Sequence, residues 1–190
     1  MCGIIGYTGS ENVKDVLLDA LELLEYRGYD SAGVALISDN QQLNVYKTKG
    51  KVSDLENFVT QKDISGTIGI AHTRWATHGE PCSANAHPHY SSSEKLALIH
   101  NGIIENYQEL KNKLLRKGYT FYSETDTEVA VKLIDYYYKK YEGTPVDAIN
   151  HAMVRIRGSY ALAVMFNDYP EEIYVARKDS PMILGIENGE

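Results

Sequence analysis

Apolar positions in the first part of the chain follow two different periods. Residues 2–7 form a short apolar run that predicts a strand. A helical period follows and ends at Gly28, with one apolar stripe made of Val13, Val16, Leu17, Ala20, Leu21 and Leu24. The runs 33–37 and 43–46 flank the turn residues Asp39 and Asn40, which predicts a hairpin.

A short helix and a buried strand are predicted next, followed by a long polar segment. Ser53 with Glu56 matches a capping box for a helix that ends near Gln61. Residues 67–71 predict a buried strand. The stretch 73–93 has no periodic apolar pattern, and about twenty residues without regular structure usually indicate a functional loop in a compact domain.

The second half alternates groups of strands with groups of helices. Residues 96–99 predict a strand that ends in a turn at Asn101-Gly102. Three helices are predicted, around 107–115 with closure at Gly118, from Thr125 with Glu128, and from Thr144-Pro145 to Gly158. Strands are then expected at 160–166, 172–177 and 182–186. This order favours an α+β domain of antiparallel sheets with helices on their outer faces.

Composition narrows the class of protein and of partner. A chain of 190 residues with 43% hydrophobic and 24% charged residues suits one folded domain. The net charge of -7 disfavours a nucleic-acid partner, and the absence of any apolar run of roughly 18 residues disfavours a membrane one. Two cysteines without a secretory segment indicate a cytoplasmic protein.

Cys2 has a special chemical position directly behind the initiator methionine. Because Cys2 and Gly3 are small, removal of Met1 would leave a first residue that carries both a thiol and a free α-amine. An α-amine with a pKa of about 7.7–8.0 can accept the proton of a thiol at ordinary pH. The pair is then a nucleophile and its base, whereas the alternative is an ordinary residue at a frayed terminus.

Several motifs resemble one enzyme family in order and over essentially the whole chain. They are CGI at 2–4, LEYRGYDSAG at 24–33, AHTRWATHG at 71–79, NAHPH at 85–89, HNG at 100–102 and SETDTE at 123–128. Together they resemble class II glutamine amidotransferases, whose glutaminase domain is an N-terminal nucleophile hydrolase. RGYDSAG and HTRWATHG resemble the glucosamine-6-phosphate synthase branch. The resemblance implies a four-layer αββα sandwich and hydrolysis of the glutamine side-chain amide through a Cys2 thioester.

The resemblance also assigns roles to individual residues. Asn101 and Gly102 would form the oxyanion hole; without the other motifs they read as a plain Asn-Gly turn. Arg74 would bind the α-carboxylate of glutamine with two parallel hydrogen bonds, and Asp126 would bind its α-ammonium. Asp126 also suits a helix start capped by Thr125. The other expected pocket residues are Arg27, near the terminal cysteine, and Trp75, Thr77 and His78.

A zinc site is the rival interpretation of the histidines. His72, His78, His87 and His89 lie in the same region as Cys82, but their spacing matches no compact metal-ligand signature. We therefore expect no metal and no cofactor. His87 and His89 would instead brace the long loop by hydrogen bonds.

The expected domain is a glutaminase domain over residues 1–190. The family's glutaminase region is longer, so a C-terminal truncation is expected, with the sugar-isomerase domains absent. The expected partners are L-glutamine and, only through those missing domains, fructose 6-phosphate, in a homo-oligomeric full-length enzyme. The alternatives are the glutaminase domain of an amidophosphoribosyltransferase-type enzyme and a non-catalytic metal-binding module.

Overall fold

Two antiparallel sheets face each other in this protein, whose structure is a computed structural model describing residues 2–62, 64–76 and 79–186. The first sheet has the order β1-β4-β2-β3 and consists of β1 (Gly3–Thr8), β2 (Ser31–Ile37), β3 (Leu43–Lys49) and β4 (Ile68–Arg74). The second has the order β5-β6-β7-β8 and consists of β5 (His89–Tyr90), β6 (Leu96–Ile104), β7 (Gly158–Phe166) and β8 (Ile173–Lys178).

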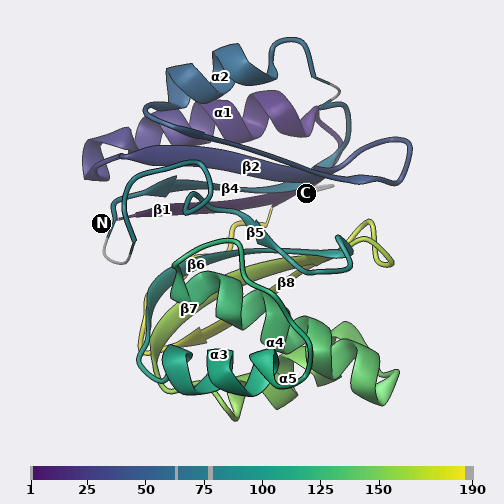
Figure 1. The fold of residues 1–190 in the computed structure, drawn as a ribbon. Helices are drawn as coiled ribbons and strands as arrows, with labels where there is room; N and C mark the ends of the chain where they lie inside the picture. Colours follow the sequence, from purple (N-terminus) through teal and green to yellow (C-terminus); the bar gives the residue numbers. More distant parts are fainter. Residues whose placement is uncertain (1, 63, 77–78, 187–190) are drawn as a thin grey trace.

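Helices cover the outer face of each sheet (Figure 1). The first sheet is covered by α1 (Val13–Leu24) and α2 (Val52–Val59), with the short 3-10 helix η1 (Glu25–Arg27) after α1. The second is covered by α3 (Tyr107–Leu115), α4 (Asp126–Tyr141) and α5 (Pro145–Met153). The predicted four-layer αββα sandwich is confirmed.

The layer between the sheets is apolar at one end and polar at the other. Its apolar part contains the buried residues Ala35, Ile37, Ile68, Ile70, Ala97, Ile99, Ala163 and Met165. Because side chains alternate along a strand, the next inward positions after Ile70 on β4 are His72 and Arg74, and the next after Ile99 on β6 is Asn101. The inner faces therefore change from aliphatic to polar toward the end where the chain begins.

Two strands are longer than the sequence predicts. β4 continues beyond Ala71 to Arg74, and β6 continues beyond Ile99 to Ile104. The predicted turn at Asn101-Gly102 is therefore wrong, since these residues pair with Ala161 and Tyr160 of β7. In both strands the polar residues continue the ladder because their backbone groups pair with a neighbouring strand.

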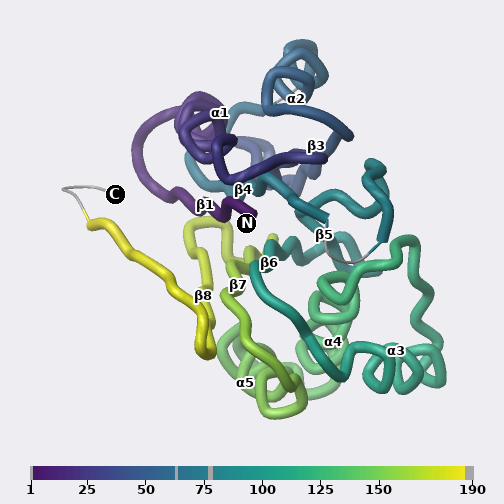
Figure 2. Tube along the Cα trace, turned by 90° about the vertical axis from the view of Figure 1, so that its left-hand side faces the viewer, coloured from purple at the N-terminus to yellow at the C-terminus, as the bar shows by residue number. Residues whose placement is uncertain are grey.

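The predicted third strand at 182–186 is not formed. The chain after β8 runs as an extended segment away from the sheets (Figure 2), and Ile183 is 94% exposed. A strand needs a neighbour for its backbone groups, and no described strand offers one here. In the same region, the helix predicted to reach Gly158 ends at Met153, and Gly158 begins β7.

Local capping residues set most helix starts. The Thr125 hydroxyl accepts from the Glu128 N–H at 3.2 Å, and Thr144 with Asp147 forms a reciprocal capping box. The predicted short helix is formed as α2, but its predicted Ser53–Glu56 capping box is wrong. The helix begins at Val52, and the Asp54 carboxylate accepts from the Lys51 N–H at 2.8 Å.

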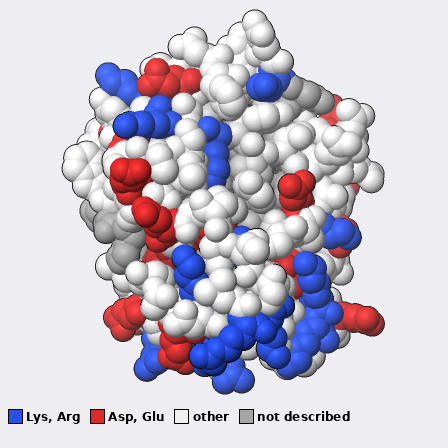
Figure 3. Space-filling view, in the orientation of Figure 1, with Lys and Arg blue, Asp and Glu red and all other residues white. Residues whose placement is uncertain are grey.

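Charge is distributed unevenly over the surface. Lys and Arg gather over the lower part of the face in Figure 3, where α3 and the turn after it carry Lys111, Lys113, Arg116 and Lys117. Both Lys113 and Arg157 form ion pairs with Glu109. None of the helices in the described ranges is long and apolar enough to cross a membrane.

Candidate active site

The Cys2 thiol lies against the end of β4. The Trp75 N–H donates to Cys2 Sγ at 3.2 Å, and the thiol lies 3.6 Å from the Trp75 carbonyl oxygen. The next residue is fixed as well, because the Gly3 N–H donates to the Thr73 hydroxyl at 3.1 Å. The start of the chain is thus held on β4, so its thiol has a defined place.

Asn101 reaches this thiol residue from the opposite sheet. Its side-chain amide donates to the backbone carbonyl of Cys2 at 3.2 Å. Gly102 follows with a φ of +129°, and an added Cβ there would overlap the Ser159 carbonyl. Glycine is therefore required beside Asn101, and its backbone is presented at the surface.

Arg74 is buried at the end of β4. Its guanidinium lies 3.7 Å from Asp30 and donates to the carbonyls of Gly79 at 3.1 Å and Glu80 at 3.4 Å. The second carboxylate oxygen of Asp30 accepts from the Ala76 N–H. Arg74 and Asp30 together fix the chain on both sides of residues 77–78.

Asp126 is the first residue of α4 and is 6% exposed. Its carboxylate accepts from the Ile104 N–H at 2.8 Å and lies 4.0 Å from His100 Nδ1. The positive end of the helix dipole favours an anion at this position. The carboxylate therefore lies just beyond the Asn101-Gly102 segment of β6.

Arg27 and Trp75 lie in segments that meet beside the terminus. Gly28 has a φ of +108°, and an added Cβ there would overlap the Trp75 ring. An added Cβ on Gly3 would lie 2.9 Å from Leu24, which shows how closely the end of α1 approaches the terminus. Arg27 lies between Leu24 and Gly28 in the chain and is half-buried. Thr77 and His78, the other expected pocket residues, lie outside the described residues.

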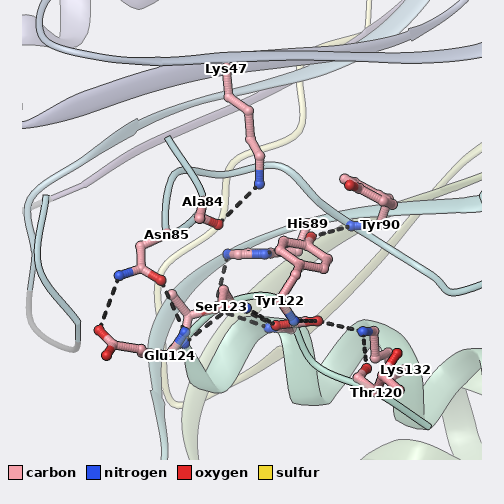
Figure 4. Close-up of polar contacts among 12 residues, drawn as sticks. Lys47, Ala84, Asn85, His89, Tyr90, Thr120, Tyr122, Ser123, Glu124 and Lys132 are labelled. Atoms are coloured by element: carbon pink, nitrogen blue, oxygen red, sulfur yellow. Dashed lines mark hydrogen bonds and ion pairs between the residues drawn. The ribbon is translucent and has the colours of Figure 1, made fainter. Parts of the chain in front are cut away.

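The loop between β4 and β5 is held by polar contacts with β3 and with the segment just before α4 (Figure 4). Lys47 of β3 donates to the carbonyls of Ala84 at 3.3 Å and Ala86 at 2.9 Å, and burial lowers its pKa to about 8. Asn85 donates to the Glu80 carbonyl at 3.0 Å and accepts from the Glu124 N–H at 3.0 Å. The segment that contacts Arg74 is therefore tied to the start of α4.

The buried histidines bind neighbouring side chains. His87 and His100 both lie within 2.9 Å of the Thr127 hydroxyl, and His89 contacts Tyr122 and Thr125. His87 and His89 thus brace the loop against α4, as expected. Burial lowers the pKa of His72, His87, His89 and His100 from the ordinary value. No cluster of three His, Cys, Asp or Glu with metal-binding geometry occurs in the described part of the chain.

Sequence reasoning missed several residues of this site. Asp30, His72, Thr73 and Thr127 lie inside the motifs that carry the resemblance, yet the sequence assigns none of them a role in glutamine binding or hydrolysis. Lys47 has no sequence signal beyond an ordinary strand position. His72 and Arg74 lie two and four positions after Ile70. Because side chains alternate along a strand, extending the predicted strand beyond Ala71 would have placed both on its inward face.

The fold and the site define the class of protein. Two antiparallel sheets face each other, and the Asn101 amide of the second sheet donates to the carbonyl of Cys2 at the edge of the first. The profile described as "Glutamine amidotransferase domain" matches residues 72–189, more than half of the chain. The chain belongs to this family.

Relatives and solved structures agree with that assignment. The chain is 66% identical over 190 residues to glutamine–fructose-6-phosphate aminotransferase (isomerizing) of Bacteroides thetaiotaomicron and 50% identical over 190 residues to the enzyme so named from Pyrococcus horikoshii. These alignments cover 100% of this chain and 31% of each relative. Glutamine phosphoribosylpyrophosphate amidotransferase of B. subtilis superposes with a TM-score of 0.78 at 28% identity, covering 93% of this chain and 37% of that one.

Proposed function

We propose that this chain is the glutaminase domain of a glutamine–fructose-6-phosphate aminotransferase. It hydrolyses the side-chain amide of L-glutamine through a Cys2 thioester and releases glutamate and ammonia. The observation that carries this proposal is the position of Asn101, whose amide lies 3.2 Å from the Cys2 carbonyl and beside the only residue that can supply both thiol and α-amine.

The reaction follows from the chemistry of that pair. The α-amine of Cys2 accepts the thiol proton, and the sulfur attacks the glutamine carboxamide carbon. The negative oxygen of the tetrahedral intermediate is stabilised by the Asn101 amide and the Gly102 N–H, a contribution of roughly 2.7–4 kcal/mol per donor. The ammonium returns its proton to the departing nitrogen, which leaves as ammonia. Water then hydrolyses the thioester to glutamate and restores the thiol.

Substrate recognition needs one cation and one anion near the thiol. Arg74 binds the α-carboxylate of glutamine, and Asp126 binds its α-ammonium. Both side chains are buried, Arg74 at the polar end of the inter-sheet layer and Asp126 where the start of α4 meets β6. The low dielectric of a buried site strengthens ion pairing. Arg27 and Trp75 border the proposed pocket; Thr77 and His78, which the resemblance also assigns to it, lie outside the described residues.

Fructose 6-phosphate is the proposed acceptor of the ammonia in the full-length protein. Residues outside this chain would perform the transfer and form glucosamine 6-phosphate. The proposal rests on identities of 66% and 50% to relatives with that name, against 28% to the phosphoribosylpyrophosphate enzyme. We also propose a homo-oligomeric full-length enzyme in the cytoplasm, in line with the sequence expectations.

Covalent capture tests the proposed nucleophile. The full-length protein is incubated with an electrophilic glutamine analogue, and intact mass and peptide mapping are recorded before and after. We expect a first residue of Cys2 without Met1, and one adduct on Cys2 that excess glutamine suppresses. An adduct on Cys82 alone, or a retained Met1 in active protein, would overturn the proposal. Supply of fructose 6-phosphate or phosphoribosylpyrophosphate as acceptor then separates the two enzyme types.

A further inference from the structure

His72 connects the two sheets directly behind the proposed oxyanion hole. It lies on β4 in the first sheet, is fully buried, and points between the sheets. Its Nε2 lies 3.0 Å from Asn101 Oδ1 and 3.2 Å from the His100 carbonyl oxygen, and both of these residues are on β6 of the second sheet.

This contact fixes which way the Asn101 amide faces. A carbonyl oxygen can only accept, so the Nε2 that lies beside the His100 carbonyl must carry the proton. That N–H can be shared only with a second acceptor, which places Oδ1 of Asn101 toward His72 and the NH2 group toward Cys2. The Cys2 carbonyl at 3.2 Å requires the same orientation, since it too can only accept.

The environment of His72 keeps the donor in place over the working pH range. Burial lowers the pKa of His72 to about 3, and the neighbouring His100 and Arg74 also disfavour a charged ring. The hydrogen bonds that His72 donates to Asn101 Oδ1 and to the His100 carbonyl oppose this shift. The ring stacks on His87 with centroids 4.2 Å apart. A neutral ring with its proton on Nε2 is therefore held rigidly between Asn101 and His87.

We propose that His72 is a positioning residue that aligns the Asn101 amide as an oxyanion donor; this inference rests on the proposed glutaminase function. An asparagine amide can rotate by 180° and present its oxygen instead of its NH2 group. An oxygen facing the oxyanion would repel it. The bond from His72 removes that alternative before glutamine binds, so no reorientation is needed during the reaction.

The test compares His72→Leu, which removes the donor, with His72→Gln, which keeps an amide donor, in the full-length protein. For His72→Leu we expect kcat for glutamine hydrolysis to fall about 10- to 100-fold with KM within about threefold, because misplacement of a catalytic group acts on the chemical step. His72→Gln should recover part of the loss. Alkylation of Cys2 by iodoacetamide should keep its rate, because that reaction forms no oxyanion.

A double-mutant cycle with Asn101→Ala separates positioning from general damage. If His72 acts through Asn101, His72→Leu should cost less than about threefold in kcat once Asn101 is alanine. The matched control is His89→Leu, which removes another buried histidine, one that contacts Tyr122 and Thr125. Its loss of kcat should add to the loss caused by Asn101→Ala. If His72→Leu does not fold, the cycle is run with His72→Met, which also lacks a donor, and judged by the same criterion.

The outcomes distinguish this inference from the proposed function. An unchanged kcat in His72→Leu, or an equal loss with and without Asn101, would overturn the positioning role while wild-type hydrolysis still supports the function. Wild-type protein that does not hydrolyse glutamine would overturn the function itself.

Discussion

The Asn101 side-chain amide donates to the backbone carbonyl of Cys2 at 3.2 Å, although the two residues are separated by 99 positions and belong to different sheets. This contact joins the start of β1 to the middle of β6. The proposed nucleophile and the proposed oxyanion donor are thus brought together by sheet packing. Their relative position depends on how the two sheets pack against each other.

Substitution of Cys2 by alanine should abolish glutamine hydrolysis and leave the fold intact. Loss of a covalent nucleophile should lower kcat by at least about a thousandfold. Circular dichroism and the melting temperature should stay close to wild type, because the thiol is at the start of β1 and only half-buried. Ammonia release measured with a coupled assay gives the rate, and retained activity would show that another group attacks.

An extension in front of Cys2 should be nearly as damaging as loss of the thiol. Retained Met1, or an added glycine, converts the α-amine into an amide that cannot accept the thiol proton. We expect hydrolysis to return when a protease removes the added residue. Activity in protein that mass spectrometry shows to be extended would contradict the role of the amine.

Replacement of Arg74 by lysine should raise KM for glutamine about 10- to 100-fold, because a lysine cannot make two parallel hydrogen bonds to a carboxylate. Steady-state kinetics measure the change. The control is Arg157→Lys, because this arginine is exposed and pairs with Glu109 of α3, so KM should not change. Equal KM values for wild type and Arg74→Lys would exclude Arg74 as the carboxylate ligand.

Alanine at Gly28 should displace Trp75. A Cβ at this position would overlap the indole ring. The backbone φ of +108° also costs a residue with a side chain about 1–3 kcal/mol. Trp75 is the only tryptophan, so its fluorescence reports the movement. Gly118→Ala is the control, because φ there is also positive at +87° while no atom lies within 4 Å of the added Cβ. A change of emission in both variants would argue against the direct contact.

Removal of the ammonium of Lys132 should destabilise the protein by about 3–5 kcal/mol, since Glu128 would remain as a buried, unpaired carboxylate. Glu128 accepts from the N–H groups of Tyr122 at 2.9 Å and Ser123 at 2.7 Å, just before the start of α4. Urea unfolding of Lys132→Met measures the loss. Lys113→Met breaks an exposed pair with Glu109 and should change stability little.

Stability should decrease as the pH falls below about 6.5, the ordinary pKa of histidine. Burial lowers the pKa of His72 to about 3 and holds those of His87 and His89 well below the usual value. The unfolded chain then binds more protons than the folded one, so each such histidine removes up to about 1.4 kcal/mol per pH unit below pH 6.5. Above pH 6.5 these histidines are neutral in both the folded and the unfolded chain, so they cause no loss of stability there.

Unfolding curves between pH 7.5 and 5 measure this dependence. The slope of the unfolding free energy against pH is the readout, and it should become shallower in His89→Leu even though that variant is less stable at every pH. An equal slope in wild type and variant would contradict a neutral, buried His89.

The helices and apolar strands could be predicted from the sequence because their signals are local. The period of α1, the Thr125 cap of α4 and the apolar run in β2 depend on neighbouring residues only. The motifs around Cys2, Arg74, Asn101 and Asp126 pointed to the proposed chemistry before their contacts were known. The site roles of Asp30, His72 and Lys47 could not be predicted, since their partners are distant in sequence.

By itself, the sequence determined the order of elements, the family and the residue types of the candidate site. Only the tertiary structure decided that β4 extends to Arg74 and β6 through Gly102, and that 182–186 forms no strand. A polar strand end and a loop have the same local pattern, because what distinguishes them is backbone pairing with a strand far away in the chain. That pairing places Cys2, His72 and Asn101 at one end of the inter-sheet layer.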